Sequence, residues 1–276
     1  MAGYAAAVCL PAAAAGDVHG ALAEVLAPFG ETSDLVEWDQ GFLWDSWRIE
    51  GAADGYGFWV AAGFEEDDRL VFDDPRWNRP AGLRLPGRCA GGPRALLDFS
   101  PSPVSGRRIA IQAWELWRRL ARENPPALPV REFVARHQET PHHRFDHEPV
   151  IAEFEAQPLV NAYLAAQPLG GRDPERFSSK SAFHANQLIE FTGDGESFAD
   201  AVVRQPLDRL DLVTVDGWWV ESYNGKANHG ACGSACEHTL TGFGPDLDGS
   251  GYAEAQVRYL DALPPDTLII CIHGHC

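Results

Sequence analysis

The chain has 276 residues, of which 45% are hydrophobic and 11% aromatic, so it can bury a substantial core and is not disordered along its length. Its 40 acidic and 22 basic side chains give a formal net charge of −18, which keeps the chain soluble, disfavours nucleic acid and anionic membranes as partners, and suits a basic protein surface or cations. Six cysteines are too few for a scaffold held together by disulfides.

The first thirty residues predict a buried strand over residues 4–10 and then a helix. Asp17 is a good N-cap, and Val18, Leu22 and Leu26 fall on one helical face. The apolar start is similar to a signal peptide but has no Lys or Arg before Arg48, and no run is long enough to cross a membrane. We therefore expect a cytoplasmic protein with reduced thiols.

Residues 31–210 are interpreted as an insertion, first rich in aromatic residues and then helical. Residues 44–51 and 56–64 predict sheet or hairpin structure, and residues 65–106 predict a surface loop, because Asp, Arg, Pro and Gly dominate there. Apolar residues at helical spacing predict the helices that follow. The predicted helices span residues 108–122, 130–138, 150–166 and 174–190.

The last part of the chain contains the clearest structural signal. Two β-branched and aromatic runs flank Asp216-Gly217 in residues 211–223, which predicts a hairpin with a two-residue turn. A loop over residues 224–249, a helix over 252–263 and a buried strand over 268–272 follow. Together with the N-terminal strand and helix, this order predicts an α+β protein: a ferredoxin-like βαββαβ core from residues 1–30 and 211–276, split by the insertion at 31–210.

One short motif carries a resemblance to a known family. WDSWRIEG, at residues 44–51, resembles the WDWYxIGG motif of an uncharacterised protein family common in bacteriophages, especially those of actinobacteria. Glu50 replaces a motif glycine, and Ala52 replaces an arginine. Four further segments are also similar to that family: LAPF, LVTVDGWWVES, HANQLIEFTGD and the closing YLDALPPDTLIICIHGHC. The last of these corresponds to an LPDDTLLTVVDCH-like strand of the family. The resemblance implies the fold and a phage or prophage source, and no activity.

The strongest candidate for chemistry is a set of metal-ligating side chains in and after the 224–249 loop. Thiolates and imidazoles at short spacing can converge on one tetrahedral zinc ion, and four protein ligands favour a structural role. Two alternatives stay open: a small apolar role for the cysteines, or a disulfide between the two cysteines of the loop. The candidate ligands are His229, Cys232, Cys236, His238, His273 and His275.

A second candidate cluster lies in TPHHRFDHEP. Imidazole and carboxylate ligands of this kind suit zinc, iron or manganese, although a solvated polar loop accounts for the same residues. The cluster consists of His142, His143, Asp146, His147 and Glu148.

Aromatic residues form a third candidate, a pocket for a planar or cationic ligand, with packing in the core as the alternative. The residues are Trp44, Asp45, Trp47, Trp218 and Trp219.

No P-loop, GxGxxG, GxSxG or HExxH pattern is present in the sequence. The leading hypothesis is therefore a phage-derived accessory protein that binds another protein, for example a host-defence inhibitor that mimics DNA with its acidic surface. The competing hypothesis is a metal-dependent enzyme, of the hydrolase class, that uses the His, Cys and Asp clusters. The oligomeric state does not follow from the sequence.

Overall fold

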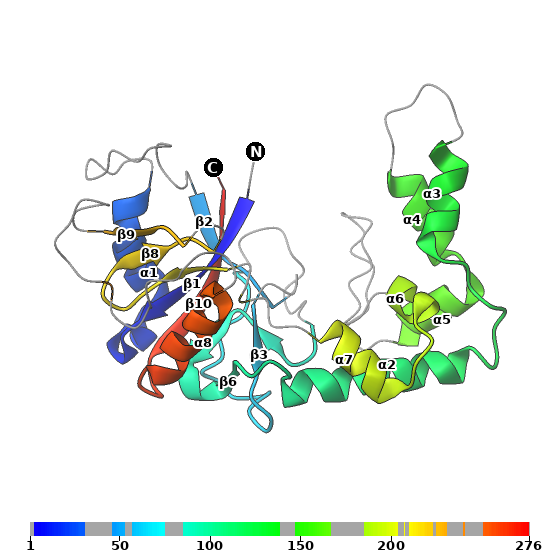
Figure 1. The fold of residues 1–276 in the computed structure, drawn as a ribbon, viewed down its shortest axis with the longest axis horizontal. Helices are drawn as coiled ribbons and strands as arrows, with labels where there is room; N and C mark the ends of the chain where they lie inside the picture. The colour runs from blue at the N-terminus through cyan, green and yellow to red at the C-terminus, as the bar shows by residue number, and fades with distance from the viewer. Residues whose placement is uncertain are drawn as a thin grey trace. The chain divides into compact units, whose positions relative to one another are not determined.

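The structure is a computed structural model that describes residues 3–30, 46–52, 57–74, 85–138, 147–166, 185–203, 207, 210–222, 225–230, 240 and 251–275. The chain is mixed α+β, as predicted, and it divides into two compact units (Figure 1). We call Met1–Pro103 with Arg204–Cys276 the sheet unit, and Val104–Val203 the helical unit. The interruption of the sheet unit therefore lies at Val104 and Val203, instead of the predicted residues 31 and 210.

Two long strands from opposite ends of the chain form the centre of the larger sheet. β1 (Gly3–Leu10) pairs in antiparallel with β10 (Leu268–His275) over its whole length, from Gly3 opposite His275 to Leu10 opposite Leu268. Apart from Ala5, which keeps a slight exposure, the described apolar residues of β1 and of residues 269–272 are almost completely buried, as near-continuous apolar runs predict. The predicted pairing of the two terminal strands is confirmed.

The strand order of this sheet is β2-β10-β1-β7-β8-β9, and β5 also pairs with β10. The ferredoxin-like plan separates its two parallel strands by a third strand, whereas β1 here pairs directly and in parallel with β7. The predicted ferredoxin-like order is therefore wrong. With β7 beside β1, β8 is left to pair with β9, a strand in the segment that the sequence had assigned to a loop. The bounds are β2 (Ser46–Ile49), β5 (Gly91–Pro93), β7 (Asp211–Val213), β8 (Trp218–Val220) and β9 (Ala227–His229).

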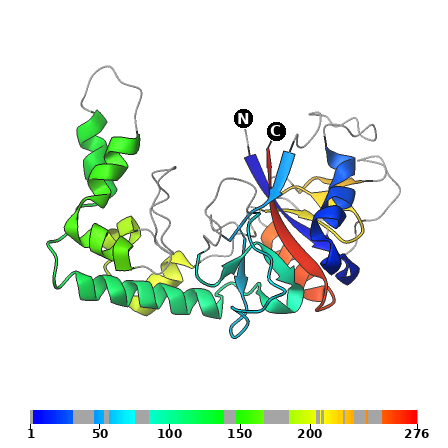
Figure 2. The same ribbon diagram turned by 180° about the vertical axis from the view of Figure 1, so that it is seen from behind.

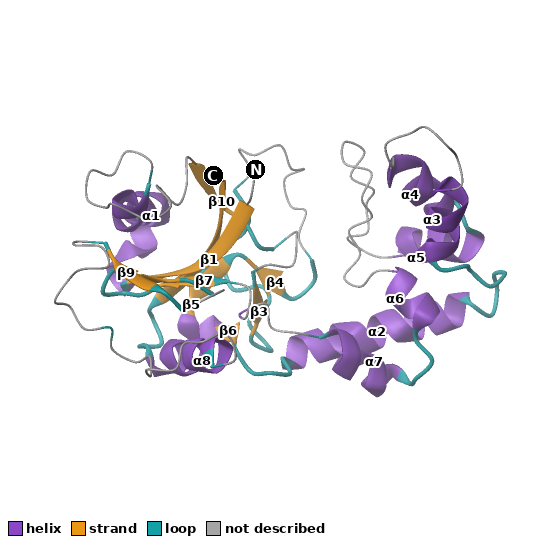
Figure 3. Cartoon of the chain, turned by 45° about the horizontal axis from the view of Figure 1, so that its top comes forward, coloured by secondary structure: helices purple, strands orange, loops and turns teal. Residues whose placement is uncertain are grey.

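One helix covers each face of the sheet (Figure 3). α1 (Val18–Leu26) begins where Asp17 accepts a hydrogen bond from the Gly20 amide, as predicted, and it packs Leu22 and Leu26 against one face. The chain continues there through the 3-10 turns η1 (Ala12–Gly16) and η2 (Ala27–Phe29). α8 (Tyr252–Ala262) covers the other face, mainly through Tyr252, Tyr259 and Leu260. The predicted inward positions Ala253 and Val257 are only half-buried, because the tyrosines lie at the centre of the buried face.

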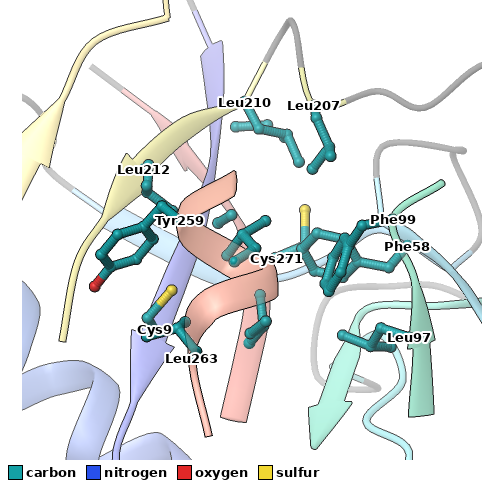
Figure 4. Packing of buried hydrophobic residues seen from close by; sticks show 14 of the residues in the cluster. Cys9, Phe58, Leu97, Phe99, Leu207, Leu210, Leu212, Tyr259, Leu263 and Cys271 are labelled. Carbon is teal, nitrogen blue, oxygen red and sulfur yellow. The ribbon is translucent and has the colours of Figure 1, made fainter. Parts of the chain in front are cut away.

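A second, three-stranded sheet of order β4-β3-β6 completes the sheet unit. The predicted surface loop at residues 65–106 is wrong, because Cys89, Ala90 and Leu96 in this segment are buried in the core. Figure 4 shows Phe58 and Phe99 packed in one cluster with Leu207 and Cys271. The 65–106 segment contributes only a few apolar residues to this core, because the other residues of the core come from distant strands. The bounds are β3 (Phe58–Val60), β4 (Arg88–Cys89), η3 (Arg94–Leu96) and β6 (Leu97–Asp98).

The turn between β7 and β8 is longer by one residue than predicted. Thr214 lies opposite Trp218, and the Gly217 amide donates to the Thr214 carbonyl oxygen at 3.1 Å. Gly217 has a φ of 83°, which favours glycine. A three-residue loop of this kind ends in a left-handed glycine, so Val215, Asp216 and Gly217 form it together.

The helical unit contains α2 to α7 among the described residues. α2 (Val104–Leu120) buries Ile109, Ala113 and Trp117, as predicted, and α3 (Val130–Gln138) has the predicted bounds. The helix predicted over 150–166 is two helices, because the Pro158 ring breaks the hydrogen-bond ladder and starts a new one. These are α4 (His147–Glu155) and α5 (Pro158–Ala166).

The last two helices of this unit are short. Of the helix predicted over 174–190, residues 174–184 lie outside the described residues and the rest contains α6 (Ala185–Glu190). α7 (Gly195–Val202) was not predicted, although Asp194 caps it by accepting from the Ser197 amide at 2.8 Å. Across the described parts of the chain, no helix is both long and apolar enough to pass through a lipid bilayer.

Candidate functional site

β2 runs beside the C-terminal end of β10 (Figure 2), and polar side chains of the two strands contact each other there. Arg48 lies directly opposite His273, and Trp47 lies opposite Gly274. Because opposite residues of an antiparallel pair project from the same face, Arg48 and His273 share one face of the sheet, and Trp47 projects from the other. We call Arg48, Glu50 and His273 the edge cluster.

The edge cluster holds a buried carboxylate beside two partly exposed nitrogen groups. The Arg48 Nε donates to Glu50 Oε2, and its Nη2 lies 3.0 Å from His273 Nδ1. The side chain of Glu50 is 3% exposed, against 28% for Arg48 and 34% for His273. The guanidinium therefore neutralises a carboxylate that water does not reach, which makes its burial tolerable.

The positions of Arg48 and Glu50 constrain the His273 ring. A guanidinium can only donate, so Nδ1 of His273 accepts from Arg48, and the ring proton of the neutral imidazole lies on Nε2. Glu50 Oε2 lies 3.5 Å from the same Nδ1, which is longer than a good hydrogen bond. Protonation of the ring would favour the carboxylate over the guanidinium as the partner of Nδ1.

The opposite face carries a second polar contact at the same sheet edge. The ring of Trp47 stacks on that of His19, with centroids 6.2 Å apart and planes 22° apart. His19 Nε2 in turn lies 3.7 Å from Asp74 Oδ2, whose side chain is 2% exposed. Trp47 also packs, partly buried, against the core cluster that contains Leu22 and Leu26 of α1, which agrees with the alternative of packing in the core.

Backbone contacts hold the end of the WDSWRIEG motif rigidly. Asp73 Oδ1 accepts from the amides of Gly51 at 2.8 Å and Ala52 at 2.7 Å. A Cβ added to Gly51 would lie 2.6 Å from the Gly57 Cα, so only glycine fits at this position. The edge cluster thus adjoins a constrained backbone, and in it Glu50 accepts from Arg48, which in turn donates to His273.

Comparison with protein-family models, with curated protein sequences and with solved structures finds no match for this chain. The chemistry of the edge cluster is therefore argued from its geometry. Within the described ranges, no group of three or more His, Cys, Asp or Glu residues could hold a metal ion.

The candidate aromatic residues of the hairpin lie apart from the edge cluster. Trp218 and Trp219 are neighbours on β8 and so project from opposite faces, where both are buried. Trp219 packs on Phe29 at 5.5 Å and donates through Nε1 to Asp211 Oδ2 at 3.1 Å. These contacts are those of core residues.

Trp47 cannot join the hairpin tryptophans in one pocket. β2 and β8 are separated by β10, β1 and β7, which amounts to about 19 Å at the usual strand spacing. Trp44 and Asp45, the other members of the predicted aromatic site, lie outside the described residues.

The predicted zinc ligands are also divided. His229 ends β9, where it is 8% exposed, its ring lies 5.1 Å from that of Trp218, and Nε2 lies 3.0 Å from the Asp216 carbonyl oxygen. β9 and β10 are separated by three strands, and His229 and His273 lie at opposite ends of the sheet. One ion cannot bind both, which corrects the predicted convergence of the two segments, because that convergence assumed the ferredoxin-like order.

The remaining predicted ligands lie outside the described residues or have side chains that do. This holds for Cys232, Cys236, His238, His142, His143 and Asp146, and for the side chains of His147, Glu148 and His275. Zinc binding by the 231–239 segment with His229 stays a prediction.

Burial makes two of the cysteine thiols unreactive at neutral pH. Cys9, Cys89 and Cys271 are buried and form no disulfide. Burial raises the pKa of Cys89 to about 12, and it raises the pKa of Cys9 further. The thiolate, which is the reactive form, is therefore absent near pH 7.

Sequence reasoning missed Arg48 and Glu50 as members of a site. Glu50 stood out only as a departure from a glycine in the resembled motif. The alternation along β2 places Arg48 and Glu50 on one face, but only the pairing of β2 with β10 brings His273 to them.

Proposed function

We propose that this protein is a non-catalytic accessory protein, of phage or prophage origin, that acts by binding another protein. The observation that carries this proposal is the unequal distribution of charge. The sheet unit has 26 acidic and 11 basic side chains, a net charge of −15, whereas the helical unit has 14 and 11, a net charge of −3. A field of one sign over one unit attracts a basic partner and accelerates its association.

A run of four carboxylates gives this field a local focus. Glu65, Glu66, Asp67 and Asp68 follow β3 in a surface turn. Hydrogen bonds from Arg69 lower the pKa of Asp67 to about 2, so this carboxylate stays ionised throughout the physiological range. A basic protein surface, such as the DNA-binding face of a host-defence protein, fits such a charge pattern, and inhibition by DNA mimicry is the concrete form of the proposal.

The phage or prophage source rests on the motif resemblance alone. The short matches at residues 44–51, at the hairpin and at the C-terminal strand support it. A structural zinc site, with His229, Cys232, Cys236 and His238 as ligands, belongs to the same proposal. A metal would order the Gly-rich segment after β9.

The proposal can be tested with matched charge variants. The partner is first captured from a host-cell lysate and then produced in purified form. The sheet-unit variant combines Glu65→Gln, Glu66→Gln and Asp68→Asn, and the control removes three exposed charges from the helical unit by Glu115→Gln, Glu123→Gln and Glu132→Gln.

We expect the sheet-unit variant to weaken binding to the purified partner at least tenfold and to flatten its dependence on salt concentration. The control variant should bind as the wild type does. Equal effects of the two variants, or binding that does not change between 50 and ~500 mM salt, would contradict an acidic docking surface.

One observation favours the competing proposal, a metal-dependent enzyme of the hydrolase class. The His273 imidazole is 34% exposed and accepts from Arg48, and a positioned, accessible imidazole is a common general acid or base in catalysis. Elemental analysis of the purified protein decides between the two. A stoichiometric transition metal together with hydrolytic activity that His273→Ala abolishes would support the enzyme, and a metal without activity would support the structural zinc site.

A further inference from the structure

The connection between α2 and α3 is an extended, proline-rich segment of the helical unit (Figure 3). Its sequence is ENPPALPV over residues 123–130, with prolines at 125, 126 and 129. Each proline ring fixes its own φ near −65°, and each residue before a proline is kept out of the helical region. These two effects act on Asn124, Leu128 and all three prolines, so they favour polyproline II geometry in the segment.

The segment presents apolar side chains to solvent. Leu128 is 51% exposed, one of four exposed large hydrophobic residues among those described. Pro125 and Pro126 are exposed, whereas Ala127 and Pro129 are half-buried. A polyproline II helix has three residues per turn, so Pro125 and Leu128 lie on the same ridge. Leu128 and the two exposed prolines thus form a small apolar patch on the surface of the helical unit.

Three amide side chains hold the segment in place. Gln157 accepts from the Leu128 amide at 2.6 Å and donates to the Leu128 carbonyl oxygen at 3.1 Å. Asn186 Oδ1 accepts from the Val130 amide at 2.8 Å, and Asn124 Nδ2 donates to the Leu120 carbonyl oxygen at 2.9 Å. The segment is thus pre-organised at both ends and at Leu128, so little conformational entropy would be lost if a partner bound it.

We propose that residues 124–129 are a docking segment for a partner protein whose groove is lined by aromatic rings. Such grooves take polyproline II ligands because flat rings pack against the pyrrolidine rings and the preformed helix has little entropy to lose. Residues 124–129 carry no charge, which sets this surface apart from a site for a basic protein or a lipid headgroup. The docking segment goes beyond the proposed function, since it lies on the helical unit and does not use the acidic surface.

The test uses the full-length protein and a panel of purified SH3, WW and EVH1 domains, whose grooves are lined by aromatic rings. Binding is measured by the change in tryptophan fluorescence or by calorimetry. The variants are Pro126→Ala and Leu128→Ala, and the matched control is Pro101→Ala, which changes an exposed proline outside the segment. Circular dichroism melting curves establish that all variants are folded.

We expect at least one domain of the panel to bind the wild type and the Pro101→Ala control equally well. Pro126→Ala and Leu128→Ala should each weaken this binding at least fivefold. Gln157→Ala should weaken it by a smaller factor without changing the exposed ridge, because the segment would lose part of its pre-organisation. Raising the salt concentration to ~500 mM should leave the affinity unchanged, which separates this result from binding by the acidic surface.

Two results would overturn the proposal. One is the absence of binding by every domain of the panel at millimolar concentration. The other is binding that Pro126→Ala and Leu128→Ala leave as strong as the Pro101→Ala control does. Neither result bears on the acidic surface of the sheet unit.

Discussion

The sheet unit and the helical unit differ in their balance of acidic and basic side chains. In the helical unit, arginines pair with surface carboxylates: Arg107 with Glu196 and Asp200, and Arg131 with Glu190. With 14 acidic and 11 basic side chains, its charges nearly cancel. The sheet unit also pairs some of its arginines, but it carries a net charge of −15, buries the carboxylates of Glu50 and Asp74 and half-buries that of Asp211.

This difference in net charge affects how each unit can bind other molecules. Surface ion pairs of the helical unit contribute little to stability, and its near balance of acidic and basic side chains leaves it a weak long-range field. We propose the apolar segment at residues 124–129 as its means of recognition. The sheet unit keeps its field, which would attract the basic partner that we propose for it. Four tests address this difference between the two units.

The largest expected effect tests whether the two cores are separate. Trp219→Ala removes a fully buried ring from the sheet unit, and Trp117→Ala removes a buried ring that lies 5.4 Å from Tyr163 in the helical unit. Each should lower the free energy of unfolding by about 3–5 kcal/mol. Hydrogen exchange read by mass spectrometry should accelerate mainly in the unit that carries the substitution.

The half-buried Trp47 provides the control, since Trp47→Ala should cost less than Trp219→Ala. Equal acceleration of exchange in both units by Trp219→Ala would show that they unfold together and would remove the basis for treating them as two units.

Glu50→Ala tests the buried carboxylate of the edge cluster. The substitution leaves Arg48 without its carboxylate partner, but Arg48 is 28% exposed and can be hydrated. We expect the free energy of unfolding to fall by about 1–3 kcal/mol, which is less than the cost of breaking a fully buried ion pair. Urea unfolding measures this change. Glu50→Gln, which keeps one acceptor, should lose less, and an unchanged stability of both variants would show that the cluster does not help to hold β2 on β10.

Asp211→Asn tests the half-buried carboxyl group of Asp211, at the start of β7. Burial raises the pKa of Asp211 above its ordinary value of 3.8, although hydrogen bonds from Ser222 and Trp219 act in the opposite direction. The folded chain therefore holds this proton more tightly than the unfolded chain, and the contribution of Asp211 to stability falls as the pH rises from 3.8 through the folded pKa.

Asp211→Asn should lower the free energy of unfolding by about 1–3 kcal/mol, because one hydrogen-bond donor loses its acceptor. This loss should be larger at acid pH than at neutral pH. Urea unfolding of both proteins at several pH values from 4 to ~7 measures this difference. A cost that instead grows with pH would mean that the hydrogen bonds of Ser222 and Trp219 outweigh the burial of the carboxylate.

The smallest effect has the opposite dependence on pH and belongs to the helical unit. The Ser197 amide lowers the pKa of Asp194, the N-cap of α7. The contribution of this cap to stability is therefore complete above the ordinary pKa of 3.8, and it is lost as the pH falls through the pKa that Asp194 has in the folded chain. Asp194→Ala should destabilise slightly at neutral pH and not at all in strong acid, while Asp194→Ser should keep the cap. A loss for Asp194→Ala that persists unchanged in strong acid would show that the side chain acts through packing.

Much of the fold could be predicted from local patterns. The apolar runs at residues 4–10 and 268–272, the Asp17 cap and the apolar spacing of α2 are features that a segment shows by itself, and each formed the predicted element. The pairing of the two terminal strands was also expected, because the ferredoxin-like order places the last strand beside the first, and this part of that order is found although the rest is not.

What the sequence alone did not decide was which strands become neighbours. The placement of β7 beside β1, and with it the separation of His229 from His273, depends on long-range packing that no local pattern encodes. The same holds for residues 65–106, whose composition is that of a loop but whose apolar residues complete a core made by β1 and β10. The edge cluster exists for that reason too: residues 48 and 273 meet because β2 pairs with β10, and only the tertiary structure determines that pairing.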